Sequence, residues 1–178
     1  MVVVFLANGF EEIEALATVD ILRRANLAVA TVGVGTPVPI GAHNMPITAD
    51  LVEADVDMTT VEAVVLPGGM PGTLNLENST LVQKTVAYAM ERNLPVAAIC
   101  AAPSILGHTG YLKGKKATCY PDFETELDGA ILCDGVVTDG NITTACGAGV
   151  AIDFALELVR ILVSGDMAES IRRGIQCR

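Results

Sequence analysis

The sequence predicts an α/β fold in which a mostly parallel sheet is covered by helices on both faces. Short apolar runs alternate with stretches of helical periodicity along the 178-residue chain, as they do in βαβ units. Hydrophobic residues make up 51% of the chain, with no Trp, so we expect a core of small aliphatic side chains. Such a core is typical of buried parallel strands. Together these observations indicate a three-layer αβα sandwich formed by one domain, residues 1–178.

The first half of the chain is expected to supply three strands and one helix. Apolar runs predict strands over residues 2–7, 28–34 and 61–66. Helical periodicity after the first of these runs predicts a helix over residues 11–25. Proline and glycine make the stretch 35–50 rich in turns.

The second half continues the alternation. A helix is expected over residues 79–92, with Ser79 as its N-cap, and a short strand over residues 95–99 leads into another helix. Three short strands and two helices follow, over residues 117–119, 131–138, 142–145, 149–163 and 166–173. Ligands of such sheets bind beyond the carboxyl ends of the strands. We therefore expect Gly9, Gly68-Gly69 and Cys100, which follow three different strands, to meet at one edge.

Charge and hydropathy exclude several classes of partner. The net charge of −10 argues against nucleic acid or an anionic membrane. The apolar run at residues 1–7 is too short to span a bilayer and lacks the basic segment of a secretory signal. We therefore expect a cytoplasmic protein that binds neither nucleic acid nor membrane.

The cysteines give no sign of a metal site or a disulfide framework. There are five, they form no CxxC pair, and the chain has only two His, so we expect no metal and no other cofactor. Free thiols in a reducing compartment are the simplest interpretation. Cys119 and Cys146 are either core thiols, which we favour, or partners that condense with Cys100. The roles of Cys133 and Cys177 stay open.

Cys100 is the most informative residue, because it falls at a predicted corner between a strand and a helix. Backbone N–H groups at a helix N-terminus lower the pKa of a nearby thiol, so we expect a thiolate at neutral pH. The alternative is a buried, inert cysteine, the common state of cysteines in apolar runs.

Glu14 is the candidate partner of this thiol. Glu11 and Glu12 are explained by the helix dipole, which favours acidic residues in the first turn. Glu14 instead shares a face with the apolar Phe10 and Ala17, where a carboxylate is costly unless it is protonated or paired. A proton held between Glu14 and Cys100 would leave the sulfur as the anion. The alternative is a glutamate at the edge of the core that points to water.

A glycine pair provides candidate anion-binding groups. Gly68 and Gly69 follow a predicted strand, and glycine permits positive φ and a close backbone approach. The N–H groups of Gly69 and Ala101 could then stabilise an oxygen anion on a bound substrate. A plain turn is one alternative. A phosphate cradle is another, although the segment lacks the Lys-Ser/Thr of a P-loop and the spacing of a dinucleotide fingerprint.

At these residues the sequence resembles the ThiJ/PfpI superfamily and, within it, the DJ-one (DJ-1) branch, the parkinsonism-associated deglycase group. Four matching segments are spread over nearly the whole chain, at residues 11–14, 66–69, 98–103 and 147–149. The resemblance implies a flavodoxin-like, usually dimeric sandwich whose cysteine lies at a strained nucleophile elbow. By position it implies Cys100 as the nucleophile and Glu14 as its protonated partner. The implied substrate-binding residues are Gly68, Gly69, Ala101 and Tyr120.

Two departures from the family narrow the implied chemistry. The protease-like branch has a His after the cysteine, where this chain has Ala101, so peptidase activity lacks its general base. The DJ-one branch often has a His where this chain has Tyr120. A phenol can hydrogen-bond a substrate oxygen but is a poor base at neutral pH.

Several functions stay open at this point. The first is a cofactor-free glyoxalase or deglycase that acts on methylglyoxal, glyoxal or early glycation adducts through a hemithioacetal on Cys100. The second is an oxidative-stress sensor that works by oxidation of Cys100 to the sulfinate. A chaperone is a weaker alternative, and peptidase activity is the weakest. The resemblance also leads us to expect a homodimer and a small dicarbonyl or aldehyde substrate.

Overall fold

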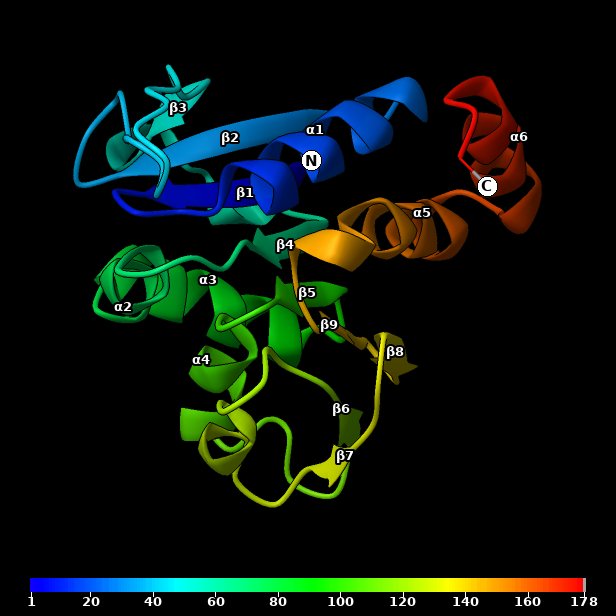
Figure 1. Ribbon diagram of the computed structural model, residues 1–178. Coiled ribbons are helices and arrows are strands. Elements are labelled where there is room, and N and C mark those ends of the chain that lie inside the picture. The colour runs from blue at the N-terminus through cyan, green and yellow to red at the C-terminus, as the bar shows by residue number, and fades with distance from the viewer. Residues whose placement is uncertain (178) are drawn as a thin grey trace.

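The computed structural model describes residues 1–177 and contains a seven-stranded sheet (Figure 1). The strand order is β3-β2-β1-β4-β5-β9-β8, and every neighbouring pair is parallel except β8 and β9. The strands are β1 (Val2–Ala7), β2 (Val29–Val34), β3 (Leu51–Val52), β4 (Ala63–Leu66), β5 (Val96–Ile99), β8 (Val136–Asp139) and β9 (Ile142–Ala145). A separate two-stranded sheet pairs β6 (Lys116–Ala117) with β7 (Ile131–Leu132).

Helices cover both faces of the large sheet, which confirms the predicted mostly parallel α/β sandwich. The helices are α1 (Glu12–Arg24), α2 (Gly72–Glu77), α3 (Thr80–Glu91), α4 (Pro103–His108), α5 (Ala151–Leu162) and α6 (Gly165–Gly174). One core cluster joins α1, α5 and α6 to one face of the sheet, and the other cluster joins α2, α3 and α4 to the opposite face. Within residues 1–177, the structure has no helix that is long and apolar enough to cross a membrane.

The two core clusters arise from the alternation of side chains along the strands. In β1, Val4 and Leu6 belong to the cluster under α1 and α5, whereas Val3 and Phe5 belong to the other cluster. All six residues of β1 are buried, as expected for a central parallel strand with helices on both sides.

Most predicted elements are present, and the differences concern short segments. The predicted strand over residues 131–138 is two strands in two different sheets, because Gly135 between them takes a φ of +75° and turns the chain. The helix expected directly after Cys100 begins only at Pro103. The strand β3 and the helix α2 were not predicted from the sequence.

The strand order places the site where the direction of chain winding reverses. From β1 the chain moves outward to β2 and β3, and it then returns to β4 on the other side of β1. Loops that leave the carboxyl ends of β1 and β4 therefore diverge and leave a crevice between them. The segments that follow β1, β4 and β5 carry the glycines and the cysteine that the sequence singled out.

Candidate active site

Cys100 lies at a corner in an unusual backbone conformation. Its φ is +65°, in the left-handed region that residues other than glycine rarely adopt. Two hydrogen bonds hold it there: its N–H donates to the carbonyl oxygen of Ala145, and its carbonyl accepts from the N–H of Tyr120, both at 2.8 Å. Strained conformations of this kind persist where the surroundings fix them, and they are common at functional sites.

Glu14 reaches this corner from the first turn of α1. Its side chain is only 1% exposed, so it does not point to water. Oε2 accepts a hydrogen bond from the N–H of Gly68 at 2.8 Å. Oε1 is buried and has no regular hydrogen-bond partner within residues 1–177, and the Cys100 thiol interacts with this carboxyl group. The structure therefore brings together the thiol and the carboxyl that the sequence paired.

Two backbone N–H groups point to the sulfur. The amides of Gly69 and Ala101 both form hydrogen bonds with Cys100 and favour its ionised form. Gly69 has a φ of +89°, which explains why glycine suits this position. Gly68 differs from expectation, since its N–H is occupied by Glu14 and its carbonyl by the N–H of Glu11. Its backbone positions Glu14, and a direct part of Gly68 in substrate binding stays a prediction.

The site favours a protonated carboxyl group. Burial raises the pKa of Glu14 to about 7, against the opposing hydrogen bond from Gly68, and the nearby charge of Glu11 adds to the rise. The Cys100 thiol interacts with this carboxyl group, so the proton can pass between the two groups.

The expected lowering of the thiol pKa is wrong while Glu14 is ionised. Burial, and then the Glu14 carboxylate, raise the pKa of Cys100 to about 12, and the N–H groups of Gly69 and Ala101 only partly oppose them. The helix that was expected to lower it has six residues and begins three positions after Cys100, so its dipole acts weakly on the sulfur. When the pair shares one proton and Glu14 holds it, the sulfur carries the negative charge. The two groups therefore act as one coupled acid.

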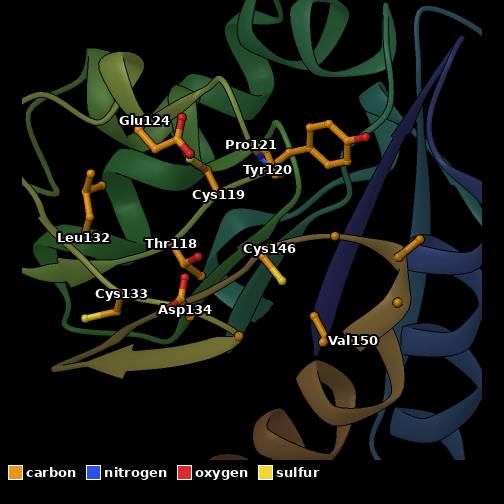
Figure 2. Close-up of a pocket in the computed structure, with 14 residues that line it drawn as sticks. Thr118, Cys119, Tyr120, Pro121, Glu124, Leu132, Cys133, Asp134, Cys146 and Val150 are labelled. Carbon is orange, nitrogen blue, oxygen red and sulfur yellow. The ribbon is translucent and has the colours of Figure 1, made fainter.

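Tyr120 connects this corner to a cavity of about 730 Å³. Of the residues that the sequence assigned to the site, only Tyr120 lines this cavity. Figure 2 shows its ring extending away from Glu124 and Leu132, and a side chain at Gly147 would lie 3.4 Å from the ring. Tyr120 therefore contributes its backbone N–H to Cys100, and its ring forms one wall of the cavity.

Three of the remaining cysteines line the same cavity: Cys119, Cys133 and Cys146 (Figure 2). Cys100, Cys119, Cys133 and Cys146 are free thiols. Cys119 belongs to the core, and burial, followed by the charges of Glu124 and Cys146, raises its pKa to about 11. Cys119 is thus a protonated core thiol at neutral pH, the alternative favoured from the sequence.

Near Glu14, the acidic residues of the first turn pair with His43, which the sequence did not predict. Glu12 is buried and accepts hydrogen bonds from the backbone N–H and from Nδ1 of His43, at 2.7 and 2.8 Å. Burial opposes ionisation of Glu12, but the hydrogen bonds from His43 outweigh it and lower the pKa of Glu12. Glu11, Glu12 and His43 are metal-ligating residue types whose donor atoms lie within 4.8 Å of one another, and Glu12 and His43 already satisfy each other. Glu12 and His43 are 31 positions apart, so no local pattern reveals their pairing.

Together, the fold and these contacts define an α/β protein with a cysteine–carboxyl pair at the carboxyl edge of a parallel sheet. Residues 1–161 match the DJ-1/PfpI family, and the chain belongs to that family, which includes enzymes with a cysteine nucleophile. It is 34% identical over 178 residues to protein DJ-1alpha of Drosophila melanogaster, which covers 97% of this chain and 82% of that protein.

Two further comparisons agree with this assignment. DJ-1 homolog B of Arabidopsis thaliana is 35% identical over 162 residues, and the match covers 89% of this chain but only 37% of that longer protein. The structure of oxidized Toxoplasma gondii DJ-1 superposes with a TM-score of 0.94 at 31% identity, covering 98% of this chain and 97% of that one.

Proposed function

We propose that this protein is a cofactor-independent glyoxalase, with deglycase-type activity on early glycation adducts, that acts through Cys100 and Glu14. The observation that carries the proposal is the buried contact between the Glu14 carboxyl and the Cys100 thiol, with two N–H groups on the sulfur. The pair supplies a nucleophile and a proton carrier, which are the two groups that the reaction needs.

In the first step, the sulfur attacks the aldehyde carbon of methylglyoxal. If the thiol holds the shared proton, that proton passes to Glu14 as the carbon–sulfur bond forms. If Glu14 already holds it, the thiolate attacks directly. The aldehyde oxygen then takes a proton from Glu14, and the product is a hemithioacetal. The N–H groups of Gly69 and Ala101 are close enough to the sulfur to stabilise the oxygen anion that forms beside it.

In the second step, Glu14 carries a proton between two carbons. Its carboxylate removes the proton from the former aldehyde carbon, and the hydroxyl proton on that carbon moves to the ketone oxygen, which gives an enediolate. Glu14 then returns its proton to the neighbouring carbon. The result is a thioester on Cys100. A carboxyl group with a pKa of about 7 suits both roles near neutral pH.

In the last step, water cleaves the thioester. Lactate leaves, or glycolate when the substrate is glyoxal, and the Cys100 thiol is restored. One dicarbonyl and one water molecule give one hydroxy acid, and the reaction involves no net oxidation or reduction. The nearby cavity of about 730 Å³ provides room for larger adducts, and a homodimer stays a prediction.

The test is a methylglyoxal assay without glutathione, run on the wild type beside Cys100→Ser and Glu14→Gln. We expect lactate from the wild type, none from Cys100→Ser, and at least about a 100-fold loss in Glu14→Gln, in line with the removal of a general base. Equal rates in the wild type and in Cys100→Ser would rule out the proposal.

A second candidate is a sensor that works by oxidation of Cys100. The residue is partly exposed, and a relative of this chain has been solved in an oxidized form. This function predicts that dilute hydrogen peroxide adds two oxygen atoms to Cys100 stoichiometrically, while methylglyoxal turnover is absent. Mass spectrometry of the intact protein and of its Cys100→Ser variant separates the two candidates.

A further inference from the structure

A closed ring of three hydrogen bonds surrounds the carboxyl group of Glu14. The N–H of Glu14 donates to Oε2 of Glu11 at 2.7 Å, and the N–H of Glu11 donates to the carbonyl of Gly68 at 2.9 Å. The N–H of Gly68 closes the ring on Oε2 of Glu14 at 2.8 Å. The ring fixes Oε2 of Glu14, and with it the carboxyl group that interacts with the Cys100 thiol.

Helix capping alone does not explain the residue type at position 11. Glu11 is the N-cap of α1, where Ser, Thr, Asp and Asn are the favoured residues. The longer side chain caps with Oε2, while Oε1 lies 4.0 Å from Nδ1 of His43. Glu11 therefore places a second carboxylate beside Glu14, and that carboxylate lies near the imidazole of His43, whose pKa is raised chiefly by its hydrogen bond with Glu12.

We propose that Glu11 is a positioning residue for the reaction: it holds Glu14 against Cys100 and keeps the shared proton on Glu14, so that the sulfur carries the charge. The inference rests on the proposed function and adds a residue to its machinery. A negative charge attracts the proton to the nearer of two sites. The Glu11 carboxylate accepts from the backbone N–H of Glu14, and its charge raises the pKa of Glu14, whereas Cys100 is reached only through Glu14.

The charged surroundings of Glu14 are few. Within residues 1–177, the titratable groups that act on it are Cys100, after β5, and Glu11, at the start of its own helix. Helix α5 packs on α1 but contributes no charge to this set. His43, from the 40–46 segment, lies near Glu11 and pairs with Glu12, which is in the first turn of α1.

The experiment measures alkylation of Cys100 by iodoacetamide as a function of pH, which does not depend on glyoxalase activity. Glu11→Gln keeps an oxygen for the cap and removes the charge. We expect the plateau rate to fall about 3- to 10-fold and the midpoint to move down by about one pH unit, as expected for the loss of a nearby charge. His43→Asn removes an imidazole that opposes the Glu11 charge when it is protonated, so it should move the midpoint upward. Glu91→Gln, at the end of α3, is the control with the same charge change and should leave the profile unchanged.

Two results would overturn the inference. The first is a profile of Glu11→Gln that coincides with those of the wild type and Glu91→Gln. The second is a shift in the same direction for Glu11→Gln and His43→Asn, which would indicate a loss of structure and not of charge. If methylglyoxal turnover is absent while the two variants shift in opposite directions, the proposed function fails and the role of Glu11 stands.

Discussion

The backbone N–H of Gly68 donates to Oε2 of Glu14, at 2.8 Å and across 54 positions of sequence. This bond ties the loop after β4 to the first turn of α1 at the point where both approach Cys100. A Cβ at position 68 would lie 2.6 Å from the Cβ of Cys100 and 2.8 Å from Glu14 Oε2. The absence of a side chain at Gly68 thus lets the thiol and the carboxyl meet.

Gly68→Ala should separate the reacting pair. The added methyl group overlaps both Cys100 and Glu14, and a displacement of about 1 Å costs on the order of 100-fold in rate. We expect methylglyoxal turnover to fall by that factor, with a loss of about 1–3 kcal/mol in unfolding free energy. Gly174→Ala, in open space at the end of α6, is the control and should retain full activity. Unchanged turnover in Gly68→Ala would contradict the geometry.

The pH dependence of stability should report the buried carboxyl group. The pKa of Glu14 is about 7 in the folded protein, against 4.5 for an ordinary glutamate, so the folded state binds the proton more tightly. Its contribution is fully present below pH 4.5 and is lost as the pH rises through 7, up to about 3 kcal/mol. Urea unfolding at pH 5 and pH 8 should therefore show a larger fall for the wild type than for Glu14→Gln. Parallel falls would show that Glu14 has an ordinary pKa.

Tyr120 should act through its backbone and its ring, and not through its hydroxyl group. Its N–H holds the carbonyl of Cys100 at 2.8 Å, and half of its side chain is exposed. Tyr120→Phe keeps the N–H and the ring, so we expect methylglyoxal turnover within about 3-fold of the wild type, a change below about 1 kcal/mol. A loss of 100-fold or more would give the phenol a direct part in the chemistry.

His108 should stabilise the protein in its protonated form. Nδ1 faces Glu77 at the end of α2, and Nε2 lies 2.8 Å from Oε2 of Glu126. The hydrogen bonds with Glu77 and then Glu126 raise the pKa of His108, so its contribution is full below pH 6.5 and is lost as the pH rises through the folded value. The melting temperature should fall more between pH 6 and pH 9 in the wild type than in His108→Gln. The difference should stay below about 1 kcal/mol, since the groups are partly exposed.

Local patterns predicted the parts of the fold that depend on burial and capping. The strands at Val2–Ala7 and Ile142–Ala145 have the predicted bounds, because each is a continuous apolar or β-branched run between turn residues. Ser79 caps α3 as expected, through its hydroxyl on the N–H of Val82. The burial of Glu14 followed from its place on the apolar face of α1. These signals lie within one or two turns of each residue.

Other features depend on residues that are distant in the sequence. Occupation of the Gly68 amide, the pairing of Glu12 with His43, and the ring through Glu11 each join segments at least 31 positions apart, and no local pattern encodes them. The thiol pKa was predicted in the wrong direction because the burial of Cys100 and the charge of Glu14 outweigh the two N–H groups. β3 was missed because two residues are too few to show a period.

The most direct test of the shared proton is the ¹³C chemical shift of the Cys100 Cβ, followed from pH 4 to pH 11. In the wild type we predict an inflection of the chemical shift near pH 7, where the coupled pair loses a proton. We predict no such inflection in Glu14→Gln. Identical titration curves in the two proteins would show that the thiol and the carboxyl ionise independently, and would contradict the mechanism.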